Sequence, residues 1–229
     1  MKHLILGDLH GKDCWKEADI NRYDKVVFLG DYVDHWTLPD VDIFQNLLEI
    51  IEIKKNHPEK IILLLGNHDV QYLHYPEFLC SGFRPSMQRA LTFAFKENRE
   101  LFNIAYQRNN YLFTHAGVTN SWYAQFLKLT LLQQIRDDDD AVADMLNKIE
   151  QTRERWLLHQ AGASRGGCGH GGPTWADRKE MKSDLLEGYH QVVGHTVIPG
   201  VEVFEYSSNT SVTFIDVLDT YTYFYEMDI

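Results

Sequence analysis

Short apolar segments recur along the first two-thirds of the chain, and a polar cluster follows each of them. These segments predict strands at Lys2–Leu6, Lys25–Leu29, Lys60–Leu65, Asn110–Thr114 and, later, Gln191–Val193. Each segment is rich in leucine or β-branched residues, and its apolar positions are continuous rather than alternating with polar ones. Such a pattern is typical of strands that are buried on both faces of a parallel sheet.

Longer segments with helical spacing lie between the predicted strands. They are Val41–Lys55, Ser86–Gln107, Trp122–Ile135 and Ala141–His159. The apolar positions that share one face of the first segment are Phe44, Leu47, Leu48 and Ile51. The acidic run Asp137–Asp140 precedes the last segment, and we expect it to complement the start of that helix rather than to bind calcium or magnesium.

The pattern changes after Gly200, where polar and apolar positions alternate. Three further strands are predicted as consecutive antiparallel hairpins, at Val201–Tyr206, Ser211–Val217 and Tyr221–Met227. Together the segments predict an α/β fold in which two mixed β-sheets form a sandwich flanked by helices. We expect residues 1–229 to form a single domain, with a helical insertion at about 120–161 and a Gly-rich loop at 162–172.

Charge and cysteine content narrow the class of protein. The 229 residues carry a formal net charge of −11, which argues against long nucleic acids and acidic membrane surfaces as partners. The three cysteines, Cys14, Cys80 and Cys168, are widely spaced and suggest a reducing, cytoplasmic location. The first residues turn polar too early for a signal peptide, and no apolar run approaches the length of a membrane span. Nothing in the sequence indicates the oligomeric state.

The polar clusters that follow the predicted strands are rich in Asp, Asn and His. They are Gly7–Gly11, Gly30–Asp34, Gly66–Asp69, Thr114–Gly117 and Gly194–Thr196. Ligands of α/β sheets bind beyond the carboxyl ends of the strands, so we expect the clusters to meet in one pocket. Each cluster alone is as readily explained by a turn, but the ordered set favours a site for manganese, iron or zinc.

These blocks resemble the signature of the calcineurin-like metallophosphoesterases. More narrowly, they are similar to the phosphoprotein phosphatase branch, which includes phage lambda-type phosphatases and symmetrical diadenosine tetraphosphatases. Many members of the superfamily have a second histidine two residues after the one that corresponds to His195, whereas this chain has Val197. That single histidine indicates the phosphoprotein phosphatase branch.

The resemblance implies a pair of divalent metal ions, with Mn²⁺ expected and iron or zinc as alternatives. The implied ligands are Asp8 and His10 for the first metal, Asp31 as the bridge, and Asn67, His115 and His195 for the second. In such sites a hydroxide that bridges the two metals attacks phosphorus in line. His68 corresponds to the family's catalytic histidine, and Asp34 to the carboxylate that orients it.

Candidate substrate contacts are His35, Arg84 and Arg178. The family pattern continues after Asp34 with Arg-Gly, but this chain has His35 and Trp36, so His35 either contacts phosphate when protonated or packs on Trp36. Arg178 ends a Trp-x-x-Arg element that resembles one in the phage and bacterial members, so it either contacts the phosphate or forms an ordinary surface ion pair. Arg84 is a candidate only because a guanidinium group suits phosphate.

The Gly-rich loop before Trp175 either forms a mobile flap at the active site or simply connects two elements. Its Cys168 and His170 are too few to form a metal site.

The resulting hypothesis is a metal-dependent phosphatase that hydrolyses phosphate monoesters, with a phosphoprotein or a small phosphoester as its partner. The same two-metal site would serve a diadenosine polyphosphate hydrolase or a phosphodiesterase. A non-catalytic binding module is the third alternative, but all six implied metal ligands and His68 are present, which favours an enzyme.

Overall fold

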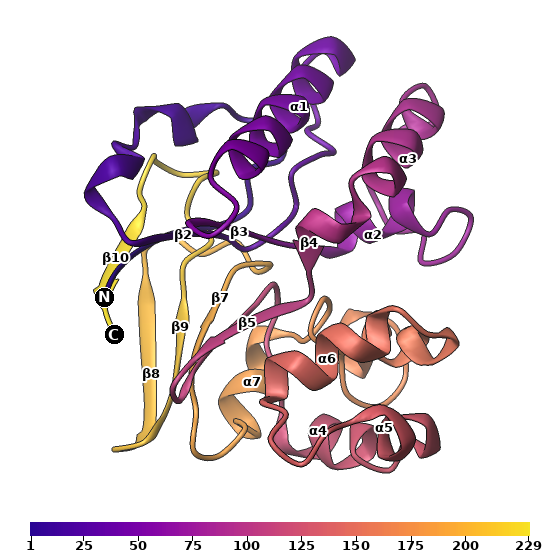
Figure 1. Ribbon diagram of the computed structural model, residues 1–229, viewed down its shortest axis with the longest axis vertical. Coiled ribbons are helices and arrows are strands. Elements are labelled where there is room, and N and C mark those ends of the chain that lie inside the picture. Colours follow the sequence, from indigo (N-terminus) through magenta and orange to yellow (C-terminus); the bar gives the residue numbers. More distant parts are fainter. The chain divides into compact units, whose positions relative to one another are not determined.

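The computed structural model describes all 229 residues and contains two compact units. The first comprises residues 1–103 and 217–229, and the second comprises residues 104–216. Each unit has its own five-stranded sheet of parallel and antiparallel strands, with helices packed against it (Figure 1). The predicted α/β class with two mixed sheets is therefore confirmed.

The sheet of the first unit is mostly parallel. Its strands are β1 (Lys2–Leu6), β2 (Lys25–Phe28), β3 (Ile61–Leu64), β4 (Phe102–Asn103) and β10 (Tyr225–Asp228). They lie in the order β10-β1-β2-β3-β4, and only β10 runs antiparallel to its neighbour. The central strands are almost entirely buried, as their uninterrupted apolar sequences predict.

Three α-helices belong to the first unit: α1 (Asp40–Asn56), α2 (Asn67–Leu73) and α3 (Gln88–Glu97). Leu47 and Ile51 lie on the buried face of α1, as predicted. Ile43 and Ile50 complete that face, whereas the predicted Leu48 is exposed. Asn46 also lies on the buried face, where its amide accepts a hydrogen bond from the Trp15 indole at 2.8 Å. Because Asn46 is polar, the sequence pattern did not indicate that it lies on the buried face of α1.

The helix predicted at Ser86–Gln107 is wrong in its second half. Helix α3 ends at Glu97, and Phe102 then pairs with Leu63 as strand β4. The local spacing of Leu101, Phe102 and Ile104 fits a helix, but pairing with a buried strand outweighs that weak preference.

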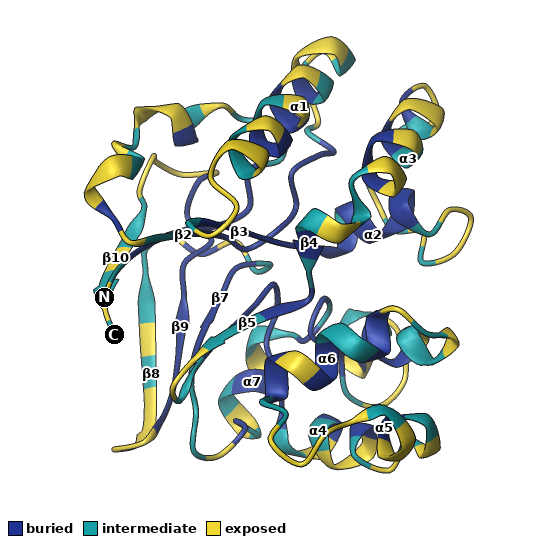
Figure 2. Ribbon diagram, viewed as in Figure 1, coloured by how far each residue is buried: buried dark blue, intermediate teal, exposed yellow.

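The sheet of the second unit is mixed. Its strands are β5 (Ala105–Arg108), β6 (Tyr111–Thr114), β7 (His190–Val193), β8 (Glu202–Ser207) and β9 (Thr210–Phe214), in the order β5-β6-β7-β9-β8. Strands β6, β7 and β9 are parallel, and β8 and β9 form an antiparallel hairpin. Figure 2 shows β9 buried along its length, whereas the edge strand β8 has largely exposed positions.

The predicted C-terminal meander of three strands is wrong in its last member. Strand β10 does not continue the β8–β9 hairpin but pairs with β1 in the sheet of the first unit. Alternating polarity identifies a strand, but it does not specify the partner of that strand.

Helices of the second unit are α4 (Asn120–Phe126), α5 (Thr130–Ile135), α6 (Val142–Glu150) and α7 (Arg178–Ser183). The segment predicted as one helix at Trp122–Ile135 is thus two, and α6 stops nine residues short of the predicted end at His159. Two residues of the acidic run, Asp137 and Asp140, form ion pairs with Lys148 on α6. None of the helices has the length and hydropathy that a membrane-spanning segment requires.

Candidate active site

The ends of parallel strands bring predicted site residues together in each unit. In the first unit, Asp8, Asp31 and Asn67 follow β1, β2 and β3. In the second, His115 and His195 follow the neighbouring strands β6 and β7. Since the carboxyl ends of adjacent parallel strands share one edge of a sheet, the order of the strands accounts for both groups.

The first group is a buried acidic cluster. The ligand atoms of Asp8, His10 and Asp31 all lie within 4.8 Å of one another, and each carboxylate is only 2% exposed. The Nδ1 atom of His10 lies 2.9 Å from the Val33 carbonyl oxygen, and its Nε2 atom lies 3.8 Å from Asp31 Oδ2. A ring nitrogen fixed by a backbone carbonyl is typical of a metal-ligating histidine. Burial lowers the pKa of His10 despite the opposing charge of Asp31, which favours the neutral ring that a ligand requires.

Asp69 holds the backbone around Asp31. Its buried carboxylate accepts hydrogen bonds from the amides of Asp31 (2.7 Å), Tyr32 (2.9 Å) and Gly66 (2.9 Å). Asp31 Oδ1 in turn accepts a bond from the His68 amide at 2.9 Å. The sequence placed Asp69 within a motif but did not indicate this role.

Two glycines allow the ends of β2 and β3 to approach each other. A Cβ atom on Gly30 would lie 2.3 Å from the Gly66 nitrogen, and one on Gly66 would lie 2.1 Å from Asp31 Oδ1. Both distances are shorter than any non-bonded contact, so only glycine fits at these positions.

Left-handed backbone conformations are concentrated among the predicted site residues. Six non-glycine residues have a positive φ, and four of them are His10 (46°), Asp31 (52°), Asp34 (70°) and His195 (65°). Each such residue costs about 1–3 kcal/mol, which the surrounding structure must offset. Strain of this kind is common where a protein holds functional side chains in a required geometry.

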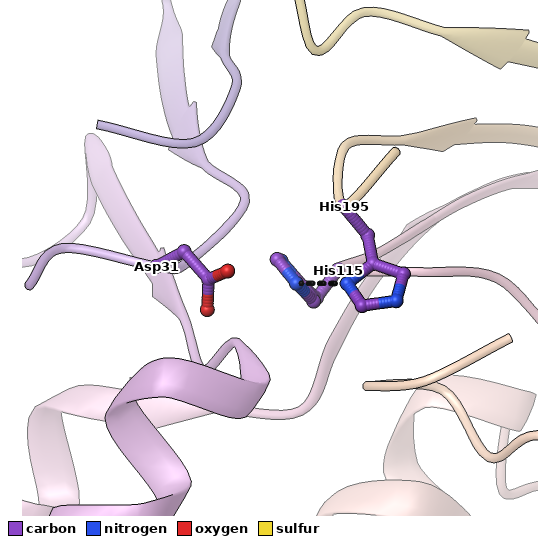
Figure 3. A group of neighbouring side chains, drawn as sticks. All are labelled: Asp31, His115 and His195. Atoms are coloured by element: carbon purple, nitrogen blue, oxygen red, sulfur yellow. Dashed lines mark hydrogen bonds between the residues drawn. The ribbon is translucent and has the colours of Figure 1, made fainter. Parts of the chain in front are cut away.

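A histidine pair forms the second group. His115 Nε2 and His195 Nδ1 lie 3.1 Å apart, and Figure 3 shows the contact between the two rings. His115 is fully buried, and the Trp175 ring meets the His195 ring edge-on at 5.5 Å between centroids. The Ala116 amide, next to His115, donates a hydrogen bond to the Pro173 carbonyl at 2.7 Å. The Trp175 segment therefore supports both histidines.

His68 and Asp34, the predicted acid and the carboxylate expected to orient it, lie 3.1 Å apart between Nδ1 and Oδ2. The carboxylate of Asp34 also accepts hydrogen bonds from Gln71 Nε2 and the Tyr72 hydroxyl. Burial lowers the pKa of His68, but the Asp31 and Asp34 carboxylates outweigh it and leave the pKa raised. The sequence analysis missed Gln71 and Tyr72, although they lie three and four residues after His68, on the same side of a helix.

The predicted substrate contacts are already engaged in other interactions. Arg84 donates to the carbonyl oxygens of His35 and Leu38 and forms an ion pair with Asp40. Arg178 forms an ion pair with Glu202, and its guanidinium lies 5.8 Å from the centre of the Phe214 ring.

His35 is fixed by its own turn. Its Nδ1 atom accepts hydrogen bonds from the amides of Thr37 (3.1 Å) and Leu38 (3.0 Å). Burial and the charge of Lys12 lower its pKa, so the ring is neutral near pH 7. His35 therefore does not supply the positive charge of the family's arginine.

Arg165, which the sequence analysis did not single out, anchors the start of the Gly-rich loop. Its guanidinium donates to Thr196 Oγ1 at 2.7 Å and pairs with Asp177 at 2.9 Å. Thr196 directly follows His195. The loop is thus attached beside a predicted ligand, while Gly166 and Gly169 have open space around them.

The chemistry of both groups fits divalent cations. Carboxylate oxygens and imidazole nitrogens are ligands for manganese, iron and zinc, and Asn67, 3% exposed at the first position of α2, adds a neutral amide. No sulfur atom belongs to either group, which disfavours a thiolate site.

Comparison with protein families identifies the class. The sequence profile of the calcineurin-like phosphoesterases matches residues 1–199. The chain belongs to this family. It is accordingly a metallophosphoesterase, a hydrolase of phosphoester bonds, and its family uses divalent metal ions.

Solved structures of the same fold include two phosphatases. A cold-active protein-tyrosine phosphatase of a psychrophilic Shewanella species is 18% identical, with a TM-score of 0.58 over 94% of this chain and 70% of that one. A protein serine/threonine phosphatase from Saccharomyces cerevisiae is 17% identical, with a TM-score of 0.52 over 94% and 67% of the respective chains. At such identities the likeness extends to the fold alone. A search among curated proteins found no matching sequence.

Proposed function

We propose that this metallophosphoesterase hydrolyses phosphate monoesters, in the manner of serine/threonine phosphoprotein phosphatases. The main support is the position of His68 relative to the acidic cluster: its amide binds Asp31, and its ring lies 5.0 Å from that of His10 between centroids. A protonated imidazole so close to metal-ligating groups suits the departure of an ester oxygen. The solved phosphatases of similar fold add support, since their names describe enzymes that act on phosphorylated proteins.

Two divalent cations would be held by Asp8, His10, Asp31, Asn67, His115 and His195, with Asp31 as the bridge. Mn²⁺ is the first choice, and iron and zinc also suit these donors. When bound, the cations supply Lewis-acid charge and lower the pKa of a water molecule to near neutrality. Two carboxylates against two dications leave a net charge of about +2, which attracts a phosphate.

The side chain of His68 acts as the general acid that protonates the leaving group. Asp34 accepts a hydrogen bond from Nδ1, so Nε2 is the atom that would donate a proton to the departing oxygen. Gln71 and Tyr72 fix the carboxylate and thereby the orientation of the ring. The carboxylates of Asp31 and Asp34 raise the pKa of His68 despite its burial, which favours the protonated form.

Arg178, Arg84 and His35 remain the proposed contacts with substrate. Arg178 is the most suitable, because its buried Nε atom has no hydrogen-bond partner. The Arg178 guanidinium would then interact with both Glu202 and the phosphate of the substrate. His35 would contribute only a neutral Nε2 donor.

The proposal extends to the partner, the cellular location and the domain organisation of the protein. We infer a phosphoprotein or small phosphoester as partner and a cytoplasmic location, which the three free cysteines support. We also infer one catalytic domain with a helical insertion at about 120–161, because the family match runs through both units.

A rate panel tests the function. Metal-free protein is supplied with Mn²⁺ and given an aryl monoester, a phosphoserine peptide, an aryl diester and a dinucleoside tetraphosphate. We expect the monoesters to have the highest kcat/KM, and Asp31→Asn to lower it by at least about 10³-fold. Asp138→Asn, on the exposed acidic run, is the matched control. Equal activity without metal, or a clear preference for the diester or the tetraphosphate, would contradict the proposal.

A further inference from the structure

The Gly-rich loop at 162–172 folds back on its own start. The Gly162 carbonyl accepts hydrogen bonds from the amides of Arg165 (2.9 Å) and Gly167 (3.0 Å). A Cβ atom on Gly167 would lie only 2.0 Å from the Ala161 carbonyl oxygen, so the chain is packed too closely there for any side chain. Contacts within the loop therefore constrain the backbone that carries Arg165.

A carboxylate of helix α7 holds the same loop from outside. Glu180 Oε2 accepts a hydrogen bond from the Gly171 amide at 3.0 Å, and Glu180 Oε1 accepts one from the Ser164 amide at 3.4 Å. A Cβ atom on Gly162 would lie 2.4 Å from Glu180 Oε1, which shows how closely the loop approaches the helix. Both ends of the loop are thus attached to α7.

The side chain of Arg165 joins two further segments. Its Nη2 atom donates a hydrogen bond to Thr196 Oγ1 at 2.7 Å, and its Nε atom lies 2.9 Å from Asp177 Oδ2 in an ion pair. The other oxygen of Asp177 accepts the Lys179 amide at 2.8 Å and caps the start of α7. Because a guanidinium group is planar and rigid, these two contacts fix the position of Thr196 relative to Asp177.

Both partners of Arg165 adjoin residues of the proposed active site. Thr196 directly follows His195, whose φ of 65° is left-handed, and the Thr196 amide donates to the Gly194 carbonyl at 2.7 Å. A residue in this conformation persists only where its surroundings stabilise it. Asp177 directly precedes Arg178, the proposed phosphate contact. Arg165 therefore connects the strained turn at His195 to the start of the helix that carries Arg178.

We propose that Arg165 is a positioning residue for His195, and that the Gly-rich loop serves to present Arg165 to the His195 turn. The inference rests on the proposed function, in which His195 binds one of the two metal ions. Arg165 does not bind the metal itself, and Asp177 neutralises its charge. Residues that hold a metal ligand in place typically change metal affinity about 10–100-fold when they are removed.

Calorimetric titration of Mn²⁺ into metal-free protein tests the role of Arg165. We expect Arg165→Ala to weaken the binding of one of the two Mn²⁺ ions by about 10–100-fold. Arg165→Lys should restore little, because a single ammonium group cannot replace both contacts of the planar fork. Arg153→Ala is the matched control: this guanidinium is 90% exposed, forms an ion pair with the adjacent Glu154, and should leave the affinity unchanged.

A double-mutant cycle tests whether Arg165 acts through Thr196. Thr196→Val keeps the shape of the side chain but removes the oxygen that accepts the Arg165 hydrogen bond. We expect Thr196→Val to weaken Mn²⁺ binding, and the double variant to bind no more weakly than Arg165→Ala alone, because both changes remove the same contact. Fully additive losses would show that Arg165 acts by another route and would overturn the inference.

Two glycine variants test the part played by the loop. Gly167→Ala forces the loop away from Ala161 while Arg165 itself is retained, and we expect it to weaken Mn²⁺ binding about tenfold. Gly169→Ala is the control, because no atom lies within 4 Å of the added Cβ atom and the positive φ of 68° affects only stability. Wild-type affinity in Gly167→Ala would show that the loop does not position Arg165.

Unfolding of the metal-free proteins in urea separates positioning from a merely structural role. An Arg165→Ala variant that folds cooperatively without metal, but binds Mn²⁺ more weakly, supports the inference, whereas wild-type Mn²⁺ affinity in that variant overturns it. If Arg165→Ala does not fold, Thr196→Val decides in the same way, because it leaves the ion pair between Arg165 and Asp177 intact.

The same measurements distinguish this inference from the proposed function. If Mn²⁺ affinity depends on Arg165 but loaded wild type hydrolyses no monoester, only the proposed function fails. If wild type hydrolyses monoesters and Arg165→Ala matches it in Mn²⁺ affinity, only the inference fails. Absence of Mn²⁺ binding by wild type overturns both.

Discussion

Hydrogen bonds from neighbouring side chains fix Asp31 and Asp34 in place, although these neighbours are not themselves predicted to contact metal or substrate. Asp69 binds the amides around Asp31, and Tyr72 and Gln71 bind the carboxylate of Asp34. Asp31 and Asp34 adopt left-handed conformations that these contacts must stabilise. At this scale the site depends on hydrogen bonds that fix the backbone and the orientation of carboxylates.

Tyr72→Phe removes one of these bonds and leaves the ring in place. The hydroxyl donates to Asp34 and accepts from the Arg84 amide at 2.8 Å, so its loss frees the carboxylate to rotate and lowers stability by about 1–2 kcal/mol. We expect kcat on phosphoserine to fall about tenfold and kcat on an activated aryl phosphate to fall much less, because only the poor leaving group needs the acid. Equal losses on both substrates would contradict a role in orienting His68.

Gly66→Ala tests the close approach of β2 and β3. The new methyl group would lie 2.1 Å from Asp31 Oδ1 and 2.6 Å from the Asp31 amide nitrogen, so the Asp31 carboxylate, the proposed bridge between the metals, has to move. We expect Mn²⁺ affinity, measured by calorimetry, to fall at least about 10–100-fold. Gly188→Ala is the control, because its surroundings are open and its positive φ of 84° costs stability without affecting metal binding. Normal Mn²⁺ affinity in Gly66→Ala would show that Asp31 is not a required ligand.

Much of this detail lay beyond what the sequence could reveal. Asp8 and Asp31 could be predicted because a buried strand places the next polar residue at the edge of the sheet. The role of Asp69 could not, since two of its partners are the backbone amides of Asp31 and Tyr32, which lie 38 and 37 residues away. The engagement of Arg84 with the His35 turn was equally invisible, because it depends on where the loop after α2 lies.

At the scale of whole elements, strands were easier to predict than helices. Continuous apolar runs identified β1, β2, β3, β6 and β7 within about one residue. Helix ends were missed where capping or pairing interrupts the apolar spacing, as at Glu97, where α3 gives way to β4. Strand β10 shows a second limit, because its partner β1 lies at the other end of the sequence.

Asn147 links helix α6 to strand β5 and provides a test at this scale. Its side chain accepts hydrogen bonds from the amides of Ile104 (2.8 Å) and Ala105 (3.1 Å) and donates to the Ala105 carbonyl (3.0 Å). Asn147→Ala would leave three backbone groups without this partner and lower the free energy of unfolding by about 2–3 kcal/mol in a urea titration. Gln151→Ala, at an exposed position just beyond α6, should change it by less than about 0.5 kcal/mol. A similar change in both variants would mean that the link contributes little.

For the molecule as a whole, the sequence identified the chemistry more completely than the architecture. The order of five polar clusters was sufficient to recognise the family that the profile match over residues 1–199 confirms. The division into two units and the distant partner of β10 were not recognisable, because both depend on contacts between segments far apart in the chain. Candidate ligands can be found in a sequence because they directly follow buried strands, whereas the pairing of strands depends on the entire fold.

Metal binding should be visible in the stability of the whole protein. A ligand that binds only the folded state raises the free energy of unfolding by about 4 kcal/mol at a free concentration of about 1,000 times its Kd. We therefore expect Mn²⁺ to shift the urea midpoint upward and a chelator to reverse the shift. Asp31→Asn and His195→Ala should each lose most of this stabilisation, while Asp138→Asn should retain it. If Mn²⁺ stabilises His195→Ala as strongly as wild type, His195 does not contribute to the metal site, and the proposed set of six ligands must be revised.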